Sequence, residues 1–362
     1  MHGVLIALSL TSVHATQYAL KDRIVGAQFY DRFDWYTEDD PTHGAVRYVT
    51  LNESLLRNMT SVYNGSFYLG VDAHLQPALG ERASTRIKSK ASYSEALIVL
   101  DLQHMPAGPG TWPAFWTSTA NYDWPYGAEI DIIEGTNDQG PALSSLHTGP
   151  NCTMPTSDDG MTGERTTYID CDSTFVQTGC GVSNTMPARV SNAVERDLKD
   201  VSRPVYTLDD RSGDPATRYS LYMSSRRNRD PSYGPEFNAR GGGIWAMQRS
   251  LESIKIFYWL RDDPALPAIL LSPHRTTLID TLNWIPSAYF PLDQCDLSQW
   301  GAHEIILNTD LCGDLASEPF RSLNITTDDC PTYVRDHPEA LQDAYWSVNA
   351  LTIFTPLLIA KR

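Results

Sequence analysis

Residues 129–134, with the sequence EIDIIE, carry three carboxylates separated by three isoleucines. The isoleucines favour burial and the β conformation, so this segment is predicted to be a strand with one wet face and one dry face. Side chains two residues apart share a face, which places Glu129 and Asp131 together. Glu134 follows Glu129 by five residues and would point to the dry face, where an unpaired carboxylate is costly. One extra residue, accommodated as a β-bulge at Ile132-Ile133, would return Glu134 to the face of the other two acids.

The rest of the first half of the chain has the same strand-like texture. Short runs of β-branched and aromatic residues, such as 45–51, 66–73 and 95–102, are separated by turn residues. In 85–92, the charged Arg86, Lys88 and Lys90 alternate with the uncharged Ile87, Ser89 and Ala91, which indicates a strand with one solvated face. Amphipathic helical periods are scarce before about residue 190, so we predict an all-β sandwich or barrel built from antiparallel strands as one domain.

Two stretches depart from this texture. Residues 181–232 are dense in charge, and residues 261–279 show no clear alternation. We expect both to be surface excursions from the sandwich and assign no fold to them.

The formal net charge of −16 over 362 residues restricts the possible partners. Nucleic acids and anionic membranes would repel such a protein, so we expect neither as a partner. A neutral polysaccharide suits this charge, although an acidic surface that only maintains solubility explains it equally well. We expect a monomer.

The first fifteen residues have the pattern of a secretory signal peptide. An apolar run over 4–10 precedes a small-residue cleavage signal at 13–15, and the run is too short to span a bilayer. Five Asn-x-Ser/Thr sequons agree with passage through a glycosylating secretory route; they begin at Asn52, Asn58, Asn64, Asn151 and Asn324. We therefore expect a secreted glycoprotein, extracellular or associated with a cell wall.

The chain has six cysteines, an even number, and none of them lies in a Cys-x-x-Cys pair. In a secreted protein we expect them to form disulfides, with the pairing left open by the sequence. A zinc site is the competing interpretation, and the spacing does not favour it. We expect no metal and no other cofactor.

Three acids on one strand face repel one another, so at least one should have a raised pKa. A retaining glycosidase needs such a set: Glu129 would attack the anomeric carbon, while Glu134 would protonate the leaving oxygen and later activate water. Asp131, between them, would hold a proton and modulate both. The alternatives are a solvated acidic strand or a calcium-binding face, and the isoleucines and nearby tryptophans weigh against them.

Aromatic residues precede the acids, and flat rings suit the faces of pyranose sugars as well as a hydrophobic core. Trp124, five residues before Glu129 in a Gly/Pro-containing turn, favours sugar contact, whereas Trp112 and Trp116 fit either role. His147 lies thirteen residues after Glu134, enough for a turn and a return along the next strand. It would then contact a carboxylate or substrate, unless it is only a structural histidine at a strand end.

Several segments resemble fungal laminarinase-like members of glycoside hydrolase family 16. The likeness is carried by GTWPAFWT, DWPYGAEIDIIEG and LHTGPNCT, and it continues in YGPEFNARGGGIWAMQRS and QCDLSQWGAHEIILNTDLCGD. The resemblance implies a β-jelly-roll sandwich of the concanavalin-like kind, with a concave cleft for β-glucan. It also implies an endo-1,3(4)-β-glucanase that acts on β-1,3 or mixed β-1,3/1,4 linkages by double displacement.

By position, the resemblance makes Glu129 the nucleophile, Glu134 the acid/base and Asp131 the assisting acid. Trp124, His147 and Trp284 would be cleft residues. Residues 16–362 would form a single catalytic domain with an atypical insertion at about 185–231, since relatives pass almost directly from GCGV to YGP. A true insertion and a translated, unspliced intron both explain that segment.

Two other functions share these residues. A wall-remodelling transglycosylase would use the same glutamates but exclude water from the glycosyl-enzyme. A non-catalytic glucan-binding protein would have no need for all three acids.

Overall fold

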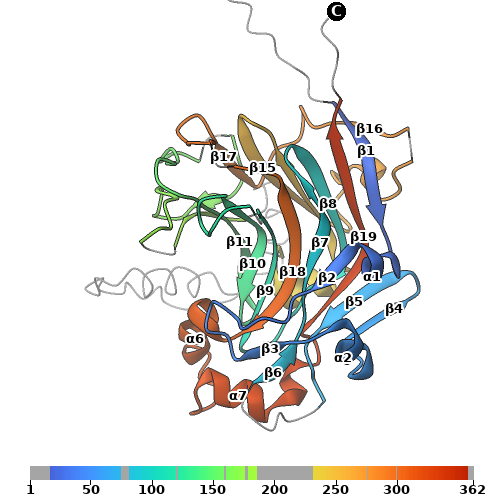
Figure 1. The fold of residues 1–362 in the computed structure, drawn as a ribbon, viewed down its shortest axis with the longest axis vertical. Helices are drawn as coiled ribbons and strands as arrows, with labels where there is room; N and C mark the ends of the chain where they lie inside the picture. The colour runs from blue at the N-terminus through green and yellow to red at the C-terminus, as the bar shows by residue number, and fades with distance from the viewer. Residues whose placement is uncertain are drawn as a thin grey trace, which may run out of the picture.

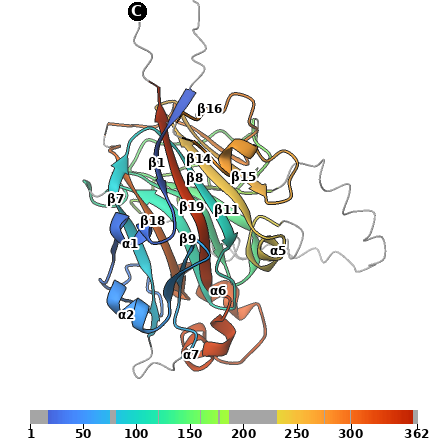
Figure 2. The same cartoon turned by 90° about the vertical axis from the view of Figure 1, so that its right-hand side faces the viewer.

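Short strands pair into two antiparallel sheets that lie face to face (Figures 1 and 2). The structure is a computed structural model, and it describes residues 17–74, 81–119, 121–158, 160–175, 178–185, 231–274, 276–298 and 300–357. The expected signal peptide (1–15) and residues 186–230 of the expected insertion lie outside the described residues. The predicted jelly-roll sandwich is confirmed.

The first sheet has nine strands, in the order β16-β1-β19-β8-β14-β15-β17, with β5 also paired to β19 and β4 to β5. Its strands are β1 (Gln17–Ile24), β4 (Thr60–Tyr63), β5 (Ser66–Gly70), β8 (Ala96–His104), β14 (Gly243–Arg249), β15 (Ser253–Leu260), β16 (Leu278–Asp280), β17 (Ala288–Pro291) and β19 (Tyr345–Pro356). Because β19 pairs with β1, the two ends of the described chain lie side by side (Figure 1).

The second sheet has eight strands, in the order β12-β13-β11-β10-β9-β18-β7-β2. They are β2 (Phe33–Trp35), β7 (Arg86–Tyr93), β9 (Thr111–Ser118), β10 (Glu129–Thr136), β11 (Gln139–His147), β12 (Glu164–Arg165), β13 (Cys180–Ser183) and β18 (His303–Leu311). A small parallel pair, β3 (Val46–Tyr48) and β6 (Arg82–Ser84), forms a separate two-stranded sheet next to β18. The EIDIIE hexad begins β10, so the acids lie near the middle of the eight-stranded sheet.

The main core lies between the sheets and follows from strand alternation. In β7, Ile87 is fully buried while Arg86 and Lys88 are half-buried on the other face, as the alternating sequence predicted. Across the gap, Ile98 and Leu100 of β8 belong to the same apolar cluster. Each sheet therefore stabilises the other by removing one apolar face from water.

The nine-stranded sheet is also covered on its outer face. Leu97 and Val99, which alternate with the core residues of β8, belong to a separate apolar cluster with Leu270, Ile279 and the partly buried Trp284. The segment that follows β15, with the 3₁₀ helix η1 (Ala268–Leu270) and β16, supplies these last residues. The irregular stretch 261–279 is thus a cover for this face, which explains why it shows no strand alternation.

Helices gather mainly at the ends of the sheets. They are α1 (Gln28–Arg32), α2 (Leu51–Leu56), α5 (Gly234–Ala239), α6 (Gly313–Arg321), α7 (Cys330–Asp336) and the 3₁₀ helix η2 (Pro338–Leu341). Thr50 caps α2 by accepting a hydrogen bond from the backbone N–H of Glu53, and Asp329 caps α7 in the same way through Thr332. The α6–α7 region packs at the lower end of the molecule around its own apolar cluster (Figure 1).

All six cysteines form disulfides, as expected. The pairs are Cys152–Cys295, Cys171–Cys180 and Cys312–Cys330. The first joins residues 143 positions apart, whereas the second closes a loop of only nine. The two bonds therefore restrict the unfolded chain to very different extents.

This difference predicts unequal losses of stability. Replacing Cys152 and Cys295 together with alanine should lower the free energy of unfolding by about 5 kcal/mol, against about 3 kcal/mol for Cys171 and Cys180, because a longer loop gains more entropy when it is released. Guanidinium denaturation of the two double variants and the parent measures both losses. An equal or larger loss for the short loop would contradict the prediction.

Candidate active site

The register of β10 shows the expected bulge. Glu129, Asp131 and Glu134 lie opposite Ser118, Trp116 and Ala114 of β9, respectively. These three β9 residues are evenly spaced by two, so the span of five on β10 matches a span of four on its neighbour. The register shifts between Asp131 and Ile133 on the β9 side and between Asp131 and Glu134 on the β11 side. The extra residue thus brings all three acids, hereafter the acid cluster, to one face.

Packing and hydrogen bonding both hold the bulge. Ile130, Ile132 and Ile133 are fully buried in the main core, so the two consecutive isoleucines of the bulge both face the dry side. The carbonyl oxygen of Ile132 accepts a hydrogen bond of 2.9 Å from the hydroxyl of Ser144. That hydroxyl in turn accepts one of 2.8 Å from the amide of Asn184. The Ile132 carbonyl at the bulge and the buried Ser144 hydroxyl are therefore both satisfied.

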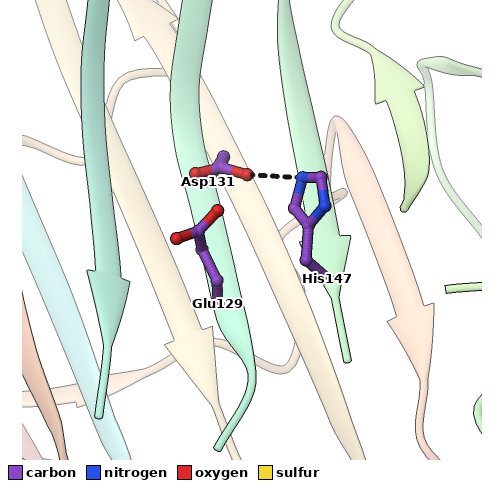
Figure 3. A group of neighbouring side chains, drawn as sticks. All are labelled: Glu129, Asp131 and His147. Atoms are coloured by element: carbon purple, nitrogen blue, oxygen red, sulfur yellow. Dashed lines mark ion pairs between the residues drawn. The ribbon is translucent and has the colours of Figure 1, made fainter. Parts of the chain in front are cut away.

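His147 ends β11 directly opposite Glu129 and turns toward Asp131 (Figure 3). Its Nε2 lies 3.3 Å from Oδ2 of Asp131, a carboxyl that is 4% exposed. Its Nδ1 lies 3.0 Å from Oγ of Ser173. The predicted contact between His147 and a carboxylate is thus present.

Trp112 and Trp116 project from β9 on the side of the acid cluster. The indole N–H of Trp112 donates to Oε1 of Glu134 at 2.9 Å. The indole N–H of Trp116 donates to Oδ1 of Asn308 on β18 at 2.8 Å, and its ring lies 4.9 Å from the guanidinium carbon of Arg86. Both tryptophans are therefore oriented by polar contacts and are not simple core residues.

Trp124 lies in the loop between β9 and β10. It is 42% exposed, and its ring centroid is 6.0 Å from that of His147. An exposed ring beside the acid cluster is available to a sugar.

Trp284, by contrast, is not brought to the site. Its ring packs edge-on against Phe257 and Trp259, with centroids 5.3 and 5.1 Å away, on the outer face of the nine-stranded sheet. The eight-stranded sheet, which carries the acid cluster, lies on the other side of that sheet. The expectation that Trp284 is a cleft residue is corrected accordingly.

Burial raises the pKa of every member of the acid cluster. It raises the pKa of Glu129 to about 8, with the charge of Asp131 adding to the effect and His147 and Arg86 opposing it. Burial raises the pKa of Asp131 to about 7. The pKa of Glu134 rises to about 7 by burial and the charge of Asp131, while His147 and the Trp112 hydrogen bond hold it down. The cluster therefore retains protons near neutral pH, where ordinary carboxyls have lost theirs.

Carboxylates and a histidine this close together could also bind a metal ion. Glu129, Asp131 and His147 place ligand atoms within 4.8 Å of one another. Metal binding, however, requires deprotonated carboxylates, and the raised pKa values of these acids work against it. The arrangement suits proton transfer better.

Four polar residues near the acid cluster were not identified from the sequence as site residues. Arg86 and Asn308 stand on the wet faces of β7 and β18, so strand alternation could have indicated them. Ser144 and Ser173 carried no comparable signal, because their partners are set by the bulge and by a loop.

The chain was compared with known families and proteins. A sequence model of a family described as "XgeA-like, catalytic GH16 domain" matches residues 33–198 and 213–354. An endo-1,3(4)-beta-glucanase of Arthroderma benhamiae is 33% identical over 97% of this chain and 68% of its own length. A probable glycosidase of Schizosaccharomyces pombe is 29% identical over 95% of this chain and 70% of its own. A probable endo-1,3(4)-beta-glucanase of Neosartorya fischeri is 32% identical, and the match spans about half of that relative (48%).

Solved structures that resemble this chain also belong to family GH16. A GH16 laminarinase 16A from Phanerochaete chrysosporium, with β-glucans in donor and acceptor sites, has a TM-score of 0.77 and 34% identity over 94% of this chain and 100% of its own. An elongating GH family 16 β-1,3-glucosyltransferase has a TM-score of 0.74 and 30% identity over 93% of this chain and 100% of its own.

The hydrogen bond from Trp112 predicts a measurable change at Glu134. Trp112→Phe keeps a ring but removes the N–H donor that lowers the pKa of Glu134, so this pKa should rise by roughly one unit or less. Titration of ¹³C-labelled glutamate carboxyls, with Glu134→Gln to assign the signal, measures the shift. Trp116→Phe is the matched control, because that indole donates to Asn308. A fall in the pKa of Glu134, or an equal rise in the control, would contradict the assignment.

Proposed function

The chain belongs to glycoside hydrolase family 16, and on that basis we propose that it is an endo-1,3(4)-β-glucanase that hydrolyses β-1,3 or mixed β-1,3/1,4-glucan with retention of anomeric configuration. The observation that carries the proposal is the bulge in β10, which brings three carboxyls to one face beside tryptophan rings, with Asp131 buried and Glu129 and Glu134 half-buried. Acid pairs flanking a glycosidic bond are the recurring machinery of this reaction. The relatives named as β-glucanases support the choice of substrate.

In the first step, the Glu129 carboxylate attacks the anomeric carbon while Glu134 gives its proton to the glycosidic oxygen. The glycosidic bond breaks, the sugar remains as an ester on Glu129, and Glu134 is left as a carboxylate. In the second step, Glu134 takes a proton from water, whose oxygen attacks the same carbon. The ester bond breaks, Glu129 leaves as a carboxylate, and Glu134 is protonated again.

In the free protein burial ranks the two pKa values against these roles, with Glu129 at about 8 and Glu134 at about 7, so the neighbouring charges decide whether Glu129 ionises. Glu129 must begin ionised, and the positive charge of Arg86 favours its charged form. Glu134 must begin protonated, and burial raises its pKa toward neutral. Between the steps Glu134 is an anion, which the Trp112 N–H stabilises by a hydrogen bond. Asp131, held protonated by its own burial, adds no charge that would oppose ionisation of Glu129.

Transglycosylation is the second candidate function, because an elongating β-1,3-glucosyltransferase of the same family resembles this chain. Its first step is identical, and a sugar hydroxyl then replaces water in the second. The two outcomes differ in products: transfer yields oligosaccharides longer than the starting one.

We propose further that the protein is secreted as a monomer, extracellular or cell-wall associated. The signal-peptide pattern of residues 1–15 supports secretion, as do three disulfides, which persist in oxidising compartments. All five sequon asparagines, Asn52, Asn58, Asn64, Asn151 and Asn324, are exposed. None of the helices in the described part of the chain combines the length and apolar content needed to cross a bilayer.

The roles of the two glutamates predict different rescue products. On laminarin and barley β-glucan, Glu129→Ala should lose more than about 10⁴-fold in kcat, and Glu134→Ala about 10²- to 10⁴-fold. Added azide should occupy the space of the missing carboxyl. It would give an α-glycosyl azide with Glu129→Ala and a β-glycosyl azide with Glu134→Ala, both identified by NMR.

The parent should release β-anomers first, and activity in both single variants would contradict the assignment. Products longer than the starting oligosaccharide would select the transglycosylase. Binding without turnover by a folded parent would point instead to a glucan-binding protein.

The secretion proposal has its own test. Expressed with its native leader in a eukaryotic host, the protein should appear in the medium with Thr16 at its N-terminus, and an endoglycosidase should lower its mass. A variant with all five sequon asparagines replaced by glutamine is the control and should show no mass change. Retention of residues 1–15 on an intracellular product would contradict secretion.

A further inference from the structure

Both ring nitrogens of His147 have partners, and together these partners restrict where its protons can be. Nδ1 lies 3.0 Å from Oγ of Ser173, and Nε2 lies 3.3 Å from Oδ2 of Asp131 (Figure 3). Ser173 is 1% exposed, so its hydroxyl has no ready access to water. The partners of that hydroxyl therefore decide its orientation.

The second partner of Ser173 is a group that can only accept. Its hydroxyl donates to the carbonyl oxygen of Cys171 at 3.3 Å. A hydroxyl has one hydrogen, so with that hydrogen on Cys171 its oxygen must accept from His147. Nδ1 of His147 then carries a proton in both the neutral and the charged ring. The proton that His147 gains or loses is the one on Nε2, which faces Asp131.

The loop that supplies these contacts is closed by a disulfide. Ser173 and Gly179 both lie between Cys171 and Cys180, which are bonded to each other. A Cβ added to Gly179 would come within 2.7 Å of Nδ1 of His147, so the loop backbone packs directly against the imidazole. The ring is thus held from one side by the loop and from the other by β10.

We propose that Ser173 is a positioning residue that fixes the Nδ1–H tautomer of His147, so that Nε2 and the Asp131 carboxyl share one mobile proton beside the nucleophile. The tautomer assignment stands on geometry alone, and only its catalytic consequence rests on the proposed glucanase function. Two bare lone pairs at 3.3 Å would repel each other, so one proton between the two groups is the favourable state.

The charged groups around this pair give the shared proton a use. Glu129 and Glu134 face it from β10, and Arg86 acts on Glu129 from β7. While Glu129 is an anion, the proton is best placed on Asp131, because a second negative charge would repel Glu129. Once Glu129 is an ester, that repulsion is gone and the proton can move to Nε2. The pair thereby adjusts its charge to the step of the reaction.

Two substitutions of equal shape isolate the hydroxyl. Ser173→Thr keeps the acceptor, whereas Ser173→Val has the same branched shape but none; Ser173→Ala serves if the branched side chains do not fit. Ser89→Ala is the matched control, because the Ser89 hydroxyl is also buried and also donates to a backbone carbonyl two residues away, that of Ala91.

The first measurement does not depend on activity. Long-range ¹H–¹⁵N NMR distinguishes the two neutral tautomers of histidine, and His147→Gln identifies the signals. The parent, Ser173→Thr and Ser89→Ala should show Nδ1–H, whereas Ser173→Val and Ser173→Ala should show Nε2–H. An Nε2–H tautomer in the parent, or an unchanged tautomer in both variants that lack the hydroxyl, would overturn the proposal.

The second measurement is the pH profile of kcat/KM on laminarin. Without Ser173, an Nε2–H donor would favour the Asp131 anion, which repels Glu129 and should move the acidic limb of the profile to higher pH. We expect kcat/KM near the parent's optimum to fall roughly tenfold, with recovery in Ser173→Thr. An unmoved limb in an otherwise active Ser173→Val would overturn the catalytic part. If the parent showed Nδ1–H but no turnover, the glucanase proposal would fail while the tautomer assignment stood.

Discussion

The site depends on one extra residue in β10. Without it, the ladder that places Asp131 opposite Trp116 would send Glu134 into the core among isoleucines. Two forces hold the bulge in place: burial of both Ile132 and Ile133, and the hydrogen bond from Ser144 to the Ile132 carbonyl. Since a slip of one residue would exchange the wet and dry faces of the strand, the hydrophobic core between the sheets also fixes the phase of the acids. Stability and chemistry thus rest on the same packing.

The position of the acids was largely predictable, because it follows from residue spacing and from the two-residue period of a β-strand. With the acids at positions i, i+2 and i+5, only a bulge keeps Glu134 out of the apolar face that the isoleucines form. The bulge is present at the predicted place. The all-β class followed from alternation such as that of β7, where Arg86 and Ile87 lie on opposite faces. These inferences need only local sequence and the two-residue period of a strand.

What could not be predicted depends on contacts between distant segments. Ser173 reaches His147 only because a disulfide closes its loop against the end of β11, and no local pattern reports that closure. The prediction that Trp284 lines the cleft was wrong for a related reason. An aromatic residue suits a sugar site or a hydrophobic core equally well, and only tertiary packing shows that Trp284 lies against Trp259. The stretch 261–279 lacked alternation because it covers a sheet and is not part of one until β16.

Charge limits how the acid cluster can ionise. The three carboxyls lie close together in a chain that is already strongly acidic. Burial raises the pKa of all three acids, and the charge of Asp131 raises it further at Glu129 and Glu134, so a cation must be close if Glu129 is to ionise as a nucleophile. Arg86 helps to meet this need because its charge lowers the pKa of Glu129. Its guanidinium carbon lies 4.4 Å from the Tyr36 ring centroid and 4.9 Å from that of Trp116, and among the described residues it forms no ion pair. A carboxylate partner would have cancelled its charge, whereas aromatic faces hold it in place and leave its field directed at the acids. The aromatic residues on the wet face of this sheet therefore orient a charge, in addition to any contact that they make with a sugar.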